Sequence, residues 1–218
     1  MALSQEGHTV SLASEGRQAY EMAIAEKHDL ILLEFFLQDL DGKELCQMIR
    51  HQPVIHGMGI LVVFEKKMDG LAAACLNSGA DAYIENPKDV HELVAYSRAL
   101  LRRPKVYFEY PRVIQKGQIT VRVTERRVLF EDRSIDHLTP KEFELIKQVI
   151  LHAPEAVTKE RLSETVWGLP FSQLNRQTLD VHIQRLRRKL GPKACDFLKT
   201  VATIGYRWDE HIPEPAKS

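Results

Sequence analysis

The sequence predicts two domains of different class, an α/β domain over residues 1–103 and an α+β domain over residues 112–212. A chain of 218 residues with 44% hydrophobic content is long enough to bury one core in each. Short apolar runs alternate with helical patterns in the first part, which is typical of a parallel sheet covered on both faces. The two parts also differ in charge: residues 1–111 hold 11 Lys and Arg against 16 Asp and Glu, and residues 112–218 hold 19 against 14. An acidic part joined to a basic part indicates a controlling module attached to one that binds nucleic acid.

Several classes of protein are excluded by what the sequence lacks. No apolar run is long enough to span a bilayer and the first residues show no signal-peptide pattern, so we expect a cytoplasmic protein without membrane contact. Cys46, Cys75 and Cys195 are far apart and lack metal-ligand spacing, which predicts free thiols and no metal site. No phosphate-binding loop and no pairing of a nucleophile with a base is recognisable, so we expect neither an enzyme nor a cofactor.

The elements of the first domain follow from its hydrophobic pattern. Strands are expected over residues 8–13, 29–36, 60–64 and 81–84, and helices over residues 16–27, 43–51, 70–78 and 89–103. The run at 29–36 is nearly all apolar, which is typical of a strand buried on both faces. Asp39 and Asp41 lie in a turn, where a solvated or turn-forming role is more frequent than metal binding.

Residues 6–103 resemble the receiver domain of two-component response regulators. The residues that carry the resemblance are Asp29-Leu30-Ile31-Leu32-Leu33-Glu34, Asp39-Leu40-Asp41-Gly42, Gly79-Ala80-Asp81-Ala82-Tyr83-Ile84 and Pro87. The resemblance implies a flavodoxin-like sheet with strand order 2-1-3-4-5. The family's first strand, with its acidic pair, would precede the segment matched by residues 6–13. We therefore expect a receiver without this strand, with either a gap or direct pairing of the strands near Thr9 and Leu30; a true start upstream of Met1 is the alternative.

Three positions that react with phosphate in this family are changed. The resemblance places the acceptor aspartate at Glu34, the Ser/Thr at Phe64 and the lysine at Asn86. Glu34 is one methylene longer than aspartate, and Phe64 and Asn86 cannot balance or sense a phosphate dianion as a hydroxyl and an ammonium group do. We expect a degenerate receiver that is not phosphorylated; imitation of a phosphorylated aspartate by the fixed charge of Glu34 is the weaker alternative.

The family's dimerisation face is expected on the last strand and the last two helices of this domain. Tyr83 corresponds to the family's rotating aromatic switch, and Glu92 and Arg98 keep charges that usually join two copies. Apolar or aromatic residues replace the other charges, Tyr96 among them. The resemblance therefore implies a homodimer through a more apolar face, and the alternative is that Tyr83 and Tyr96 are ordinary half-buried aromatics.

The second domain follows residues 104–111, which are bounded by prolines and predict a short, stiff linker. Strands are expected over residues 118–123 and 127–130. Thr139-Pro140-Lys141-Glu142 is a capping box with proline at the first helical position, and the helix it begins ends near His152. Thr158 is expected to cap a second helix over residues 159–167. Residues 197–201 and 206–208 predict a terminal hairpin, and residues 213–218 a tail.

The third helix of this domain, over residues 176–190, combines an apolar stripe with a basic face. Leu179, Ile183, Leu186 and Leu190 recur at a helical period and are expected in the core. The four positive charges that lie within five residues, Arg185, Arg187, Arg188 and Lys189, suit a polyanion. Val181 falls outside the stripe, in place to touch a thymine methyl group. A basic amphipathic helix with a merely solvated face is the alternative for this stretch alone.

Platform strands, three helices and a terminal hairpin together predict a winged helix-turn-helix. Residues 112–209 resemble the DNA-binding domain of OmpR/PhoB-type regulators through four runs, Leu138-Thr139-Pro140-Lys141-Glu142-Phe143, Val166-Trp167-Gly168, residues 180–191 and Gly205-Tyr206-Arg207. The resemblance implies that the third helix enters the major groove and that the hairpin lies over the minor groove.

The same resemblance assigns the DNA contacts. It places Arg185 at a base edge, and the residues expected to hold the DNA backbone are Thr178, His182, Arg187, Arg188, Lys189, Thr200 and Arg207. Packing of His182 in the core is the alternative to its DNA contact. Ala202 and Thr203 stand where the family commonly has Arg-Gly in the wing, which puts minor-groove reading by an arginine in doubt.

The whole sequence thus predicts an atypical orphan regulator of transcription, of the response-regulator type, that binds double-stranded DNA as a dimer without phosphorylation. RNA polymerase is a further expected partner. The rival hypothesis is a protein-interaction module that titrates another regulator or RNA polymerase through residues 168–175 and the receiver face, with vestigial DNA binding. The altered wing favours the rival, and the intact basic helix argues against it.

Overall fold

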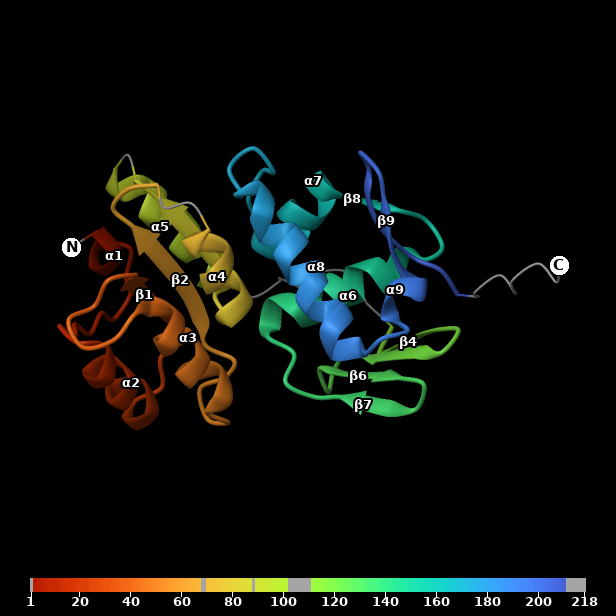
Figure 1. Cartoon of the computed structure of the whole chain (residues 1–218), viewed down its shortest axis with the longest axis horizontal. Coiled ribbons are helices and arrows are strands. Elements are labelled where there is room, and N and C mark those ends of the chain that lie inside the picture. Colours follow the sequence, from red (N-terminus) through yellow and green to blue (C-terminus); the bar gives the residue numbers. More distant parts are fainter. Residues whose placement is uncertain (1, 68–69, 88, 102–110, 211–218) are drawn as a thin grey trace, which may run out of the picture. The chain divides into compact units, whose positions relative to one another are not determined.

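The computed structural model describes residues 2–67, 70–87, 89–101 and 111–210. The chain divides into two compact units, residues 1–103 with 172–181 and residues 104–171 with 182–218. Figure 1 shows a parallel sheet with its helices in the first half of the chain, and antiparallel strands with further helices in the second half. The expected linker lies outside the described residues apart from Pro111, as does the tail at 213–218.

The first half contains one sheet of three parallel strands among its described residues. These strands are β1 (Leu30–Glu34), β2 (Gly59–Phe64) and β3 (Ala82–Glu85), paired in the order β1-β2-β3. The helices that alternate with them are α2 (Gly16–Ala25), α3 (Gly42–His51), α4 (Leu71–Ser78) and α5 (Val90–Leu101). A four-residue helix α1 (Ala2–Gln5), which the pattern does not predict, precedes them. The predicted alternation of strands and helices is confirmed from residue 16 onward.

The strand expected at residues 8–13 is wrong, because these residues have no regular secondary structure. Val10 and Leu12 expose 41% and 74% of their surface, so the apolar side chains of this alternating segment do not pack into a core. The direct pairing expected between the segments near Thr9 and Leu30 is likewise not made in the described residues. As a result β1 is the outer strand of the sheet, and Leu30 is only half-buried where burial on both faces was expected.

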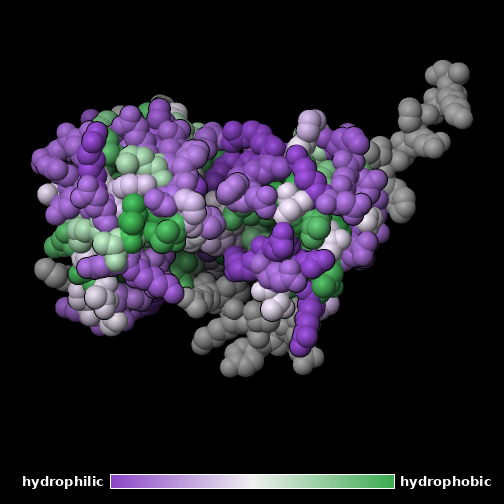
Figure 2. Space-filling model, turned by 90° about the horizontal axis from the view of Figure 1, so that it is seen from below, coloured by the Kyte–Doolittle hydropathy of each residue, from purple (hydrophilic) through white to green (hydrophobic). Residues whose placement is uncertain are grey.

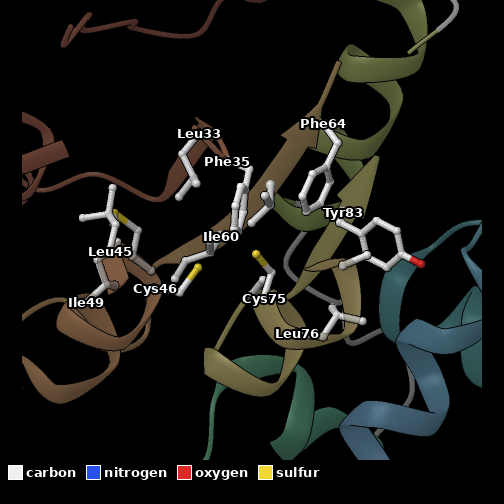
Figure 3. Close-up of a cluster of buried hydrophobic side chains, with 14 of the residues drawn as sticks. Leu33, Phe35, Leu45, Cys46, Ile49, Ile60, Phe64, Cys75, Leu76 and Tyr83 are labelled. Carbon is white, nitrogen blue, oxygen red and sulfur yellow. The ribbon is translucent and has the colours of Figure 1, made fainter. Parts of the chain in front are cut away.

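The core of this sheet lies between its strands and helices α3 and α4 (Figure 3). Leu33, Leu45, Ile49, Ile60 and Leu76 are buried there, as the apolar pattern predicts. Close packing of this kind supplies most of the folding free energy that a sheet and its helices share. The sheet is therefore a rigid support for the residues at its carboxyl edge.

A buried ion pair joins α3 to the start of β3. Arg50 Nη2 lies 2.8 Å from Asp81 Oδ2, and the same carboxylate oxygen accepts a hydrogen bond of 2.8 Å from the backbone N–H of Ile60. Arg50 also donates to the carbonyls of Gly79, His56 and Met58. The guanidinium thus holds the loops that enter β2 and β3 at one end of the sheet.

The second half begins with a four-stranded antiparallel sheet, β4 (Val113–Lys116), β5 (Ile119–Arg122), β6 (Arg127–Phe130) and β7 (Arg133–Ile135), paired in sequence order. The sequence predicted only the middle two strands, because β4 and β7 are four and three residues long and their polar residues are adjacent, so no alternation is visible. The helices are α6 (Pro140–His152), α7 (Lys159–Leu162) with its π-helical continuation η1 (Ser163–Trp167), α8 (Arg176–Leu190) and α9 (Ala194–Phe197). The terminal sheet pairs β8 (Val157–Thr158), β10 (Gly205–Trp208) and β9 (Leu198–Val201) in that order.

The caps expected in this half are present. Thr139 Oγ1 accepts from the backbone N–H of Glu142, whose carboxylate accepts in turn from the N–H of Thr139 at 2.7 Å. Thr158 Oγ1 accepts from the N–H of Arg161 at 3.2 Å. Trp208 is fully buried and stacks on Phe197, with ring centroids 5.4 Å apart. The predicted winged arrangement, platform sheet, helices and terminal hairpin, is thereby confirmed.

Candidate functional site

Helix α8 buries the predicted apolar stripe. Leu179, Ile183, Leu186 and Leu190 are all buried, and Gly191 ends the helix with a φ of 104°, a left-handed conformation that favours glycine. The positions of the polar and basic side chains of α8 depend on what each of them contacts. In the second half of the helix these side chains lie against a buried carboxylate, against the wing, or at the solvent-exposed surface.

Glu142 of the α6 capping box is the buried carboxylate. Its Oε1 lies 2.9 Å from Arg185 Nε, and its Oε2 accepts a hydrogen bond of 2.6 Å from Lys189 Nζ. Lys189 Nζ also donates to the carbonyl of His137 at 2.6 Å. Burial by itself raises the pKa of Glu142, but the charges of Arg185 and Lys189 outweigh it, so the pKa is lowered from its usual 4.5. Glu142 is therefore a carboxylate anion that holds two cations of α8.

Arg185, which the resemblance places at a base edge, is buried. Its side chain lies against Glu142, and each of these two buried charges depends on the other as its counter-charge. His182 is also fully buried, with its ring centroid 5.2 Å from that of Trp167, which is the alternative considered for it. Thr178 and Val181, in the first turns of α8, are buried as well.

Arg187 ties α8 to the wing. Its Nε and Nη2 donate to the carbonyl of Leu198 in β9 at 3.0 and 2.6 Å, and Nη2 donates to Thr200 Oγ1 at 3.0 Å. Arg207 of β10 pairs with Asp209, with Nε 2.6 Å from Oδ1, and this hydrogen bond raises the pKa of Arg207. Thr200 remains exposed on β9.

The outward positions in the second half of α8 belong to Gln184 and Arg188, which are exposed. Figure 2 shows one face of the molecule, on which hydrophilic residues predominate and hydrophobic ones form small groups. Sequence reasoning did not single out Gln184, although helical phase places it on a different side of the helix from the stripe residues Ile183 and Leu186. It also missed the pairing of Glu142, for which the capping box was the only signal.

The three changed receiver positions come together at the carboxyl ends of the strands. Glu34 ends β1 and is exposed, and Phe64 ends β2 and is buried. Asn86 follows β3 with a φ of 49°, and its backbone N–H donates to the carbonyl of Phe64 at 2.7 Å. The cavity at this edge, of about 140 Å³, is lined by Glu34, Phe35, Phe36, Val63, Phe64, Glu65 and Lys66.

Aromatic rings occupy the centre of this edge. Phe35 stacks on Phe64 with ring centroids 5.2 Å apart, and Tyr83 meets Phe64 edge-on at 6.2 Å (Figure 3). The charged groups of the lining are two carboxylates, Glu34 and Glu65, against one ammonium, Lys66. The lining thus offers one ammonium group, two carboxylates and no hydroxyl group.

The turn aspartates have structural roles. Asp39 accepts hydrogen bonds from the N–H groups of Gly16 and Arg17, at 2.7 and 2.9 Å, and the bond from Arg17 lowers the pKa of Asp39 most. Asp41 caps α3 by accepting from the N–H of Glu44. Both carboxylates thus bind backbone N–H groups at the starts of helices, Asp39 at α2 and Asp41 at α3, where a solvated or turn-forming role was expected. Across the ranges that the structure describes, no three His, Cys, Asp or Glu residues are grouped as a metal site.

The expected dimer face has partners within the chain. Tyr83 and Tyr96 are buried rather than half-buried. Arg98 forms an ion pair with Glu6, and this contact lowers the pKa of Glu6. Glu92 is partly exposed at the start of α5, where its N–H donates to Asp89. In the described part of the chain, no helix has the length and apolar character needed to cross a membrane.

Comparison with known proteins covers both halves of the chain. Residues 1–98 match the family described as response regulator receiver domain, and residues 132–208 match the family described as transcriptional regulatory protein, C terminal. The alkaline phosphatase synthesis transcriptional regulatory protein SphR of Synechococcus elongatus is 34% identical over 219 residues, covering 95% of this chain and 84% of SphR. The uncharacterized transcriptional regulatory protein YclJ of Bacillus subtilis is 32% identical, covering 96% of this chain and 92% of YclJ.

A solved structure has the same arrangement of elements. A cysteine-to-serine mutant of the protein RitR superposes with a TM-score of 0.71 at 26% identity, covering 96% of this chain and 92% of RitR. The matches therefore extend over nearly the whole length of both partners. The chain belongs to the OmpR/PhoB-type response regulators, which are DNA-binding transcription regulators and not enzymes.

Proposed function

We propose that this chain is a degenerate orphan regulator that recognises specific DNA sequences without being phosphorylated. The observation that carries the proposal is the carboxyl edge of the receiver sheet, where Phe64 and its stacked neighbour Phe35 stand in place of a phosphate-sensing hydroxyl. Glu34 and Glu65 add negative charge where a phosphoryl group would add more. Regulation then comes from the amount of protein, a protein partner or a small ligand.

DNA binding is assigned to α8 and the wing. We place α8 in the major groove and the turn between β9 and β10 over the minor groove. Arg188 and Thr200 are exposed and suited to phosphate contacts. Arg187 and Arg207, each already hydrogen-bonded at the wing, add positive charge beside them.

The same proposal includes a cytoplasmic location, domains over residues 1–103 and 112–212, and RNA polymerase as a partner. It also includes a homodimer through the face of α4, β3 and α5. A dimer of this kind requires two half-sites about one helical turn, roughly 10 base pairs, apart.

Selection from a random duplex pool tests DNA recognition. The purified full chain is used without a phosphodonor at two salt concentrations, and the retained DNA is sequenced. An enriched pair of half-sites supports the proposal. Retention that collapses with salt and yields no motif contradicts it and favours the module that titrates a protein partner, since only nonspecific charge attraction would remain.

Phosphorylation is tested separately with acetyl phosphate and Mg²⁺. Intact mass spectrometry should show no added phosphoryl group, and the selected DNA should be bound equally before and after the treatment. A phosphorylatable receiver from another response regulator serves as the positive control. A phosphorylated form of this chain with altered DNA affinity would overturn the phosphate-independent part of the proposal while leaving DNA recognition standing.

A further inference from the structure

The second half of α8 divides its polar residues between internal ties and an exposed outward line. Arg185 and Lys189 are bound to Glu142, and Arg187 is bound to the carbonyl of Leu198. Gln184 and Arg188 are exposed and four positions apart, so they lie one above the other on the same face of the helix. Gln184 and Arg188 are thus the side chains of this half of the helix that are exposed to solvent.

Arg185 is poorly placed to read a base. Its guanidinium is buried beside a carboxylate that is itself inaccessible to solvent. A swing out toward DNA would remove one of two cations from a desolvated anion, which is unfavourable because a buried charge depends on its partners. Arg185 instead positions α8 on α6, through Glu142.

We propose that Gln184 is the residue of α8 that determines base specificity, by reading the edge of an adenine; this inference rests on the DNA recognition proposed above. A glutamine amide offers one donor and one acceptor side by side, which match N7 and N6 of adenine in the major groove. A guanine offers two acceptors at that edge, and a cytosine a donor only, so neither pairs with both amide groups. Arg188, one turn further along the same face, gives the charge for a neighbouring phosphate.

The test is the duplex selection repeated with the full chain and three variants. The wild type should yield a motif with one adenine position that depends on residue 184. Gln184→Ala should use all four bases at that position, keep the rest of the motif, and bind the wild-type site about tenfold more weakly. Gln184→Arg should prefer guanine at the same position, because a guanidinium donates to both guanine acceptors. Gln115→Ala, a change of an exposed glutamine on platform strand β4, is the matched control and should leave the motif unchanged.

Two results overturn the inference. One is a Gln184→Ala motif with every position intact. The other is equal weakening on all sequences, which is the behaviour of a phosphate contact. Far-UV circular dichroism of each variant confirms folding, and substitutions at an exposed site of this kind usually change stability little. A wild type that yields no motif would instead overturn the proposed DNA recognition itself, and this inference with it.

Discussion

Glu142 and Arg185 form an ion pair that is closed to solvent: Oε1 and Nε lie 2.9 Å apart, and the two side chains expose 0% and 6% of their surface. Lys189 approaches the other carboxylate oxygen. One residue thus caps α6 and fastens α8, so the N-terminus of one helix and the middle of another depend on a single carboxylate.

Glu142→Gln should destabilise the winged-helix domain by about 3 to 5 kcal/mol, because it leaves Arg185 buried without its counter-charge. Urea unfolding followed by tryptophan fluorescence measures this, since the two tryptophans of the chain, Trp167 and Trp208, are both buried in this domain. Glu131→Gln breaks the exposed pair with Lys193 and should cost less than about 1 kcal/mol. Equal losses in the two variants would refute a special role of Glu142.

The stability of the same domain should fall in acid in a way that depends on Glu142. The folded pKa of Glu142 is lowered from 4.5, so its charge stabilises the fold fully above pH 4.5. That contribution is lost as the pH falls below 4.5 and through the folded pKa. The difference in unfolding free energy between wild type and Glu142→Gln should therefore be constant near neutrality and shrink in acid; a difference that is independent of pH from about 7 to about 2 contradicts this.

Arg50→Ala should destabilise the receiver sheet by about 3 to 5 kcal/mol, because Asp81 is then buried without its guanidinium. Hydrogen exchange followed by mass spectrometry should show faster exchange in β2 and β3, whose entry loops Arg50 holds. The control is Arg122→Ala, which removes an exposed pair with Glu125 in the other domain. Unchanged exchange in β2 and β3 would show that the pair does not support the sheet.

One of the three cysteines should react quickly with a thiol reagent in the native chain. Cys195 is exposed, whereas Cys46 and Cys75 are buried, and burial raises the pKa of Cys75 to about 12. Titration with Ellman's reagent should release one equivalent rapidly and the other two only after unfolding in urea. Rapid release of two equivalents, or loss of the fast reaction in Cys46→Ser instead of Cys195→Ser, would contradict this placement.

The order and type of most elements could be predicted, because apolar residues at helical or alternating spacing decide which face is buried. Residues 8–13 show the limit of this reasoning: an alternating pattern becomes a strand only where a neighbouring strand edge and a core are available. The position of Arg185 shows another limit. Its partner in α6 lies 43 positions earlier in the sequence, and no local pattern says whether a cation of an amphipathic helix turns to water or to a buried anion.

The candidate site was predicted as a helix and a wing, and the roles of single residues remained open. Four basic residues lie within five positions of α8, yet Arg185 and Lys189 are bound to Glu142 and Arg187 is bound to β9. Composition gives the charge of such a face, and only tertiary contacts decide which charges are available to a partner. The changes at Glu34, Phe64 and Asn86 could be identified from the sequence alone. The resemblance assigns these three positions, and their side chains can then be compared with those that the family uses.

The hydrogen bonds from Arg187 to Leu198 and Thr200 have a mechanical consequence. They join α8 and β9, the first strand of the wing, into one stiff unit in which the distance between the helix and the wing is fixed. We expect the distance between α8 and the wing to change little when the domain binds a duplex. If this distance differs from the spacing of the major and minor grooves, the DNA must deform to fit. Sequences that bend or twist easily then bind more tightly, even where no base is contacted.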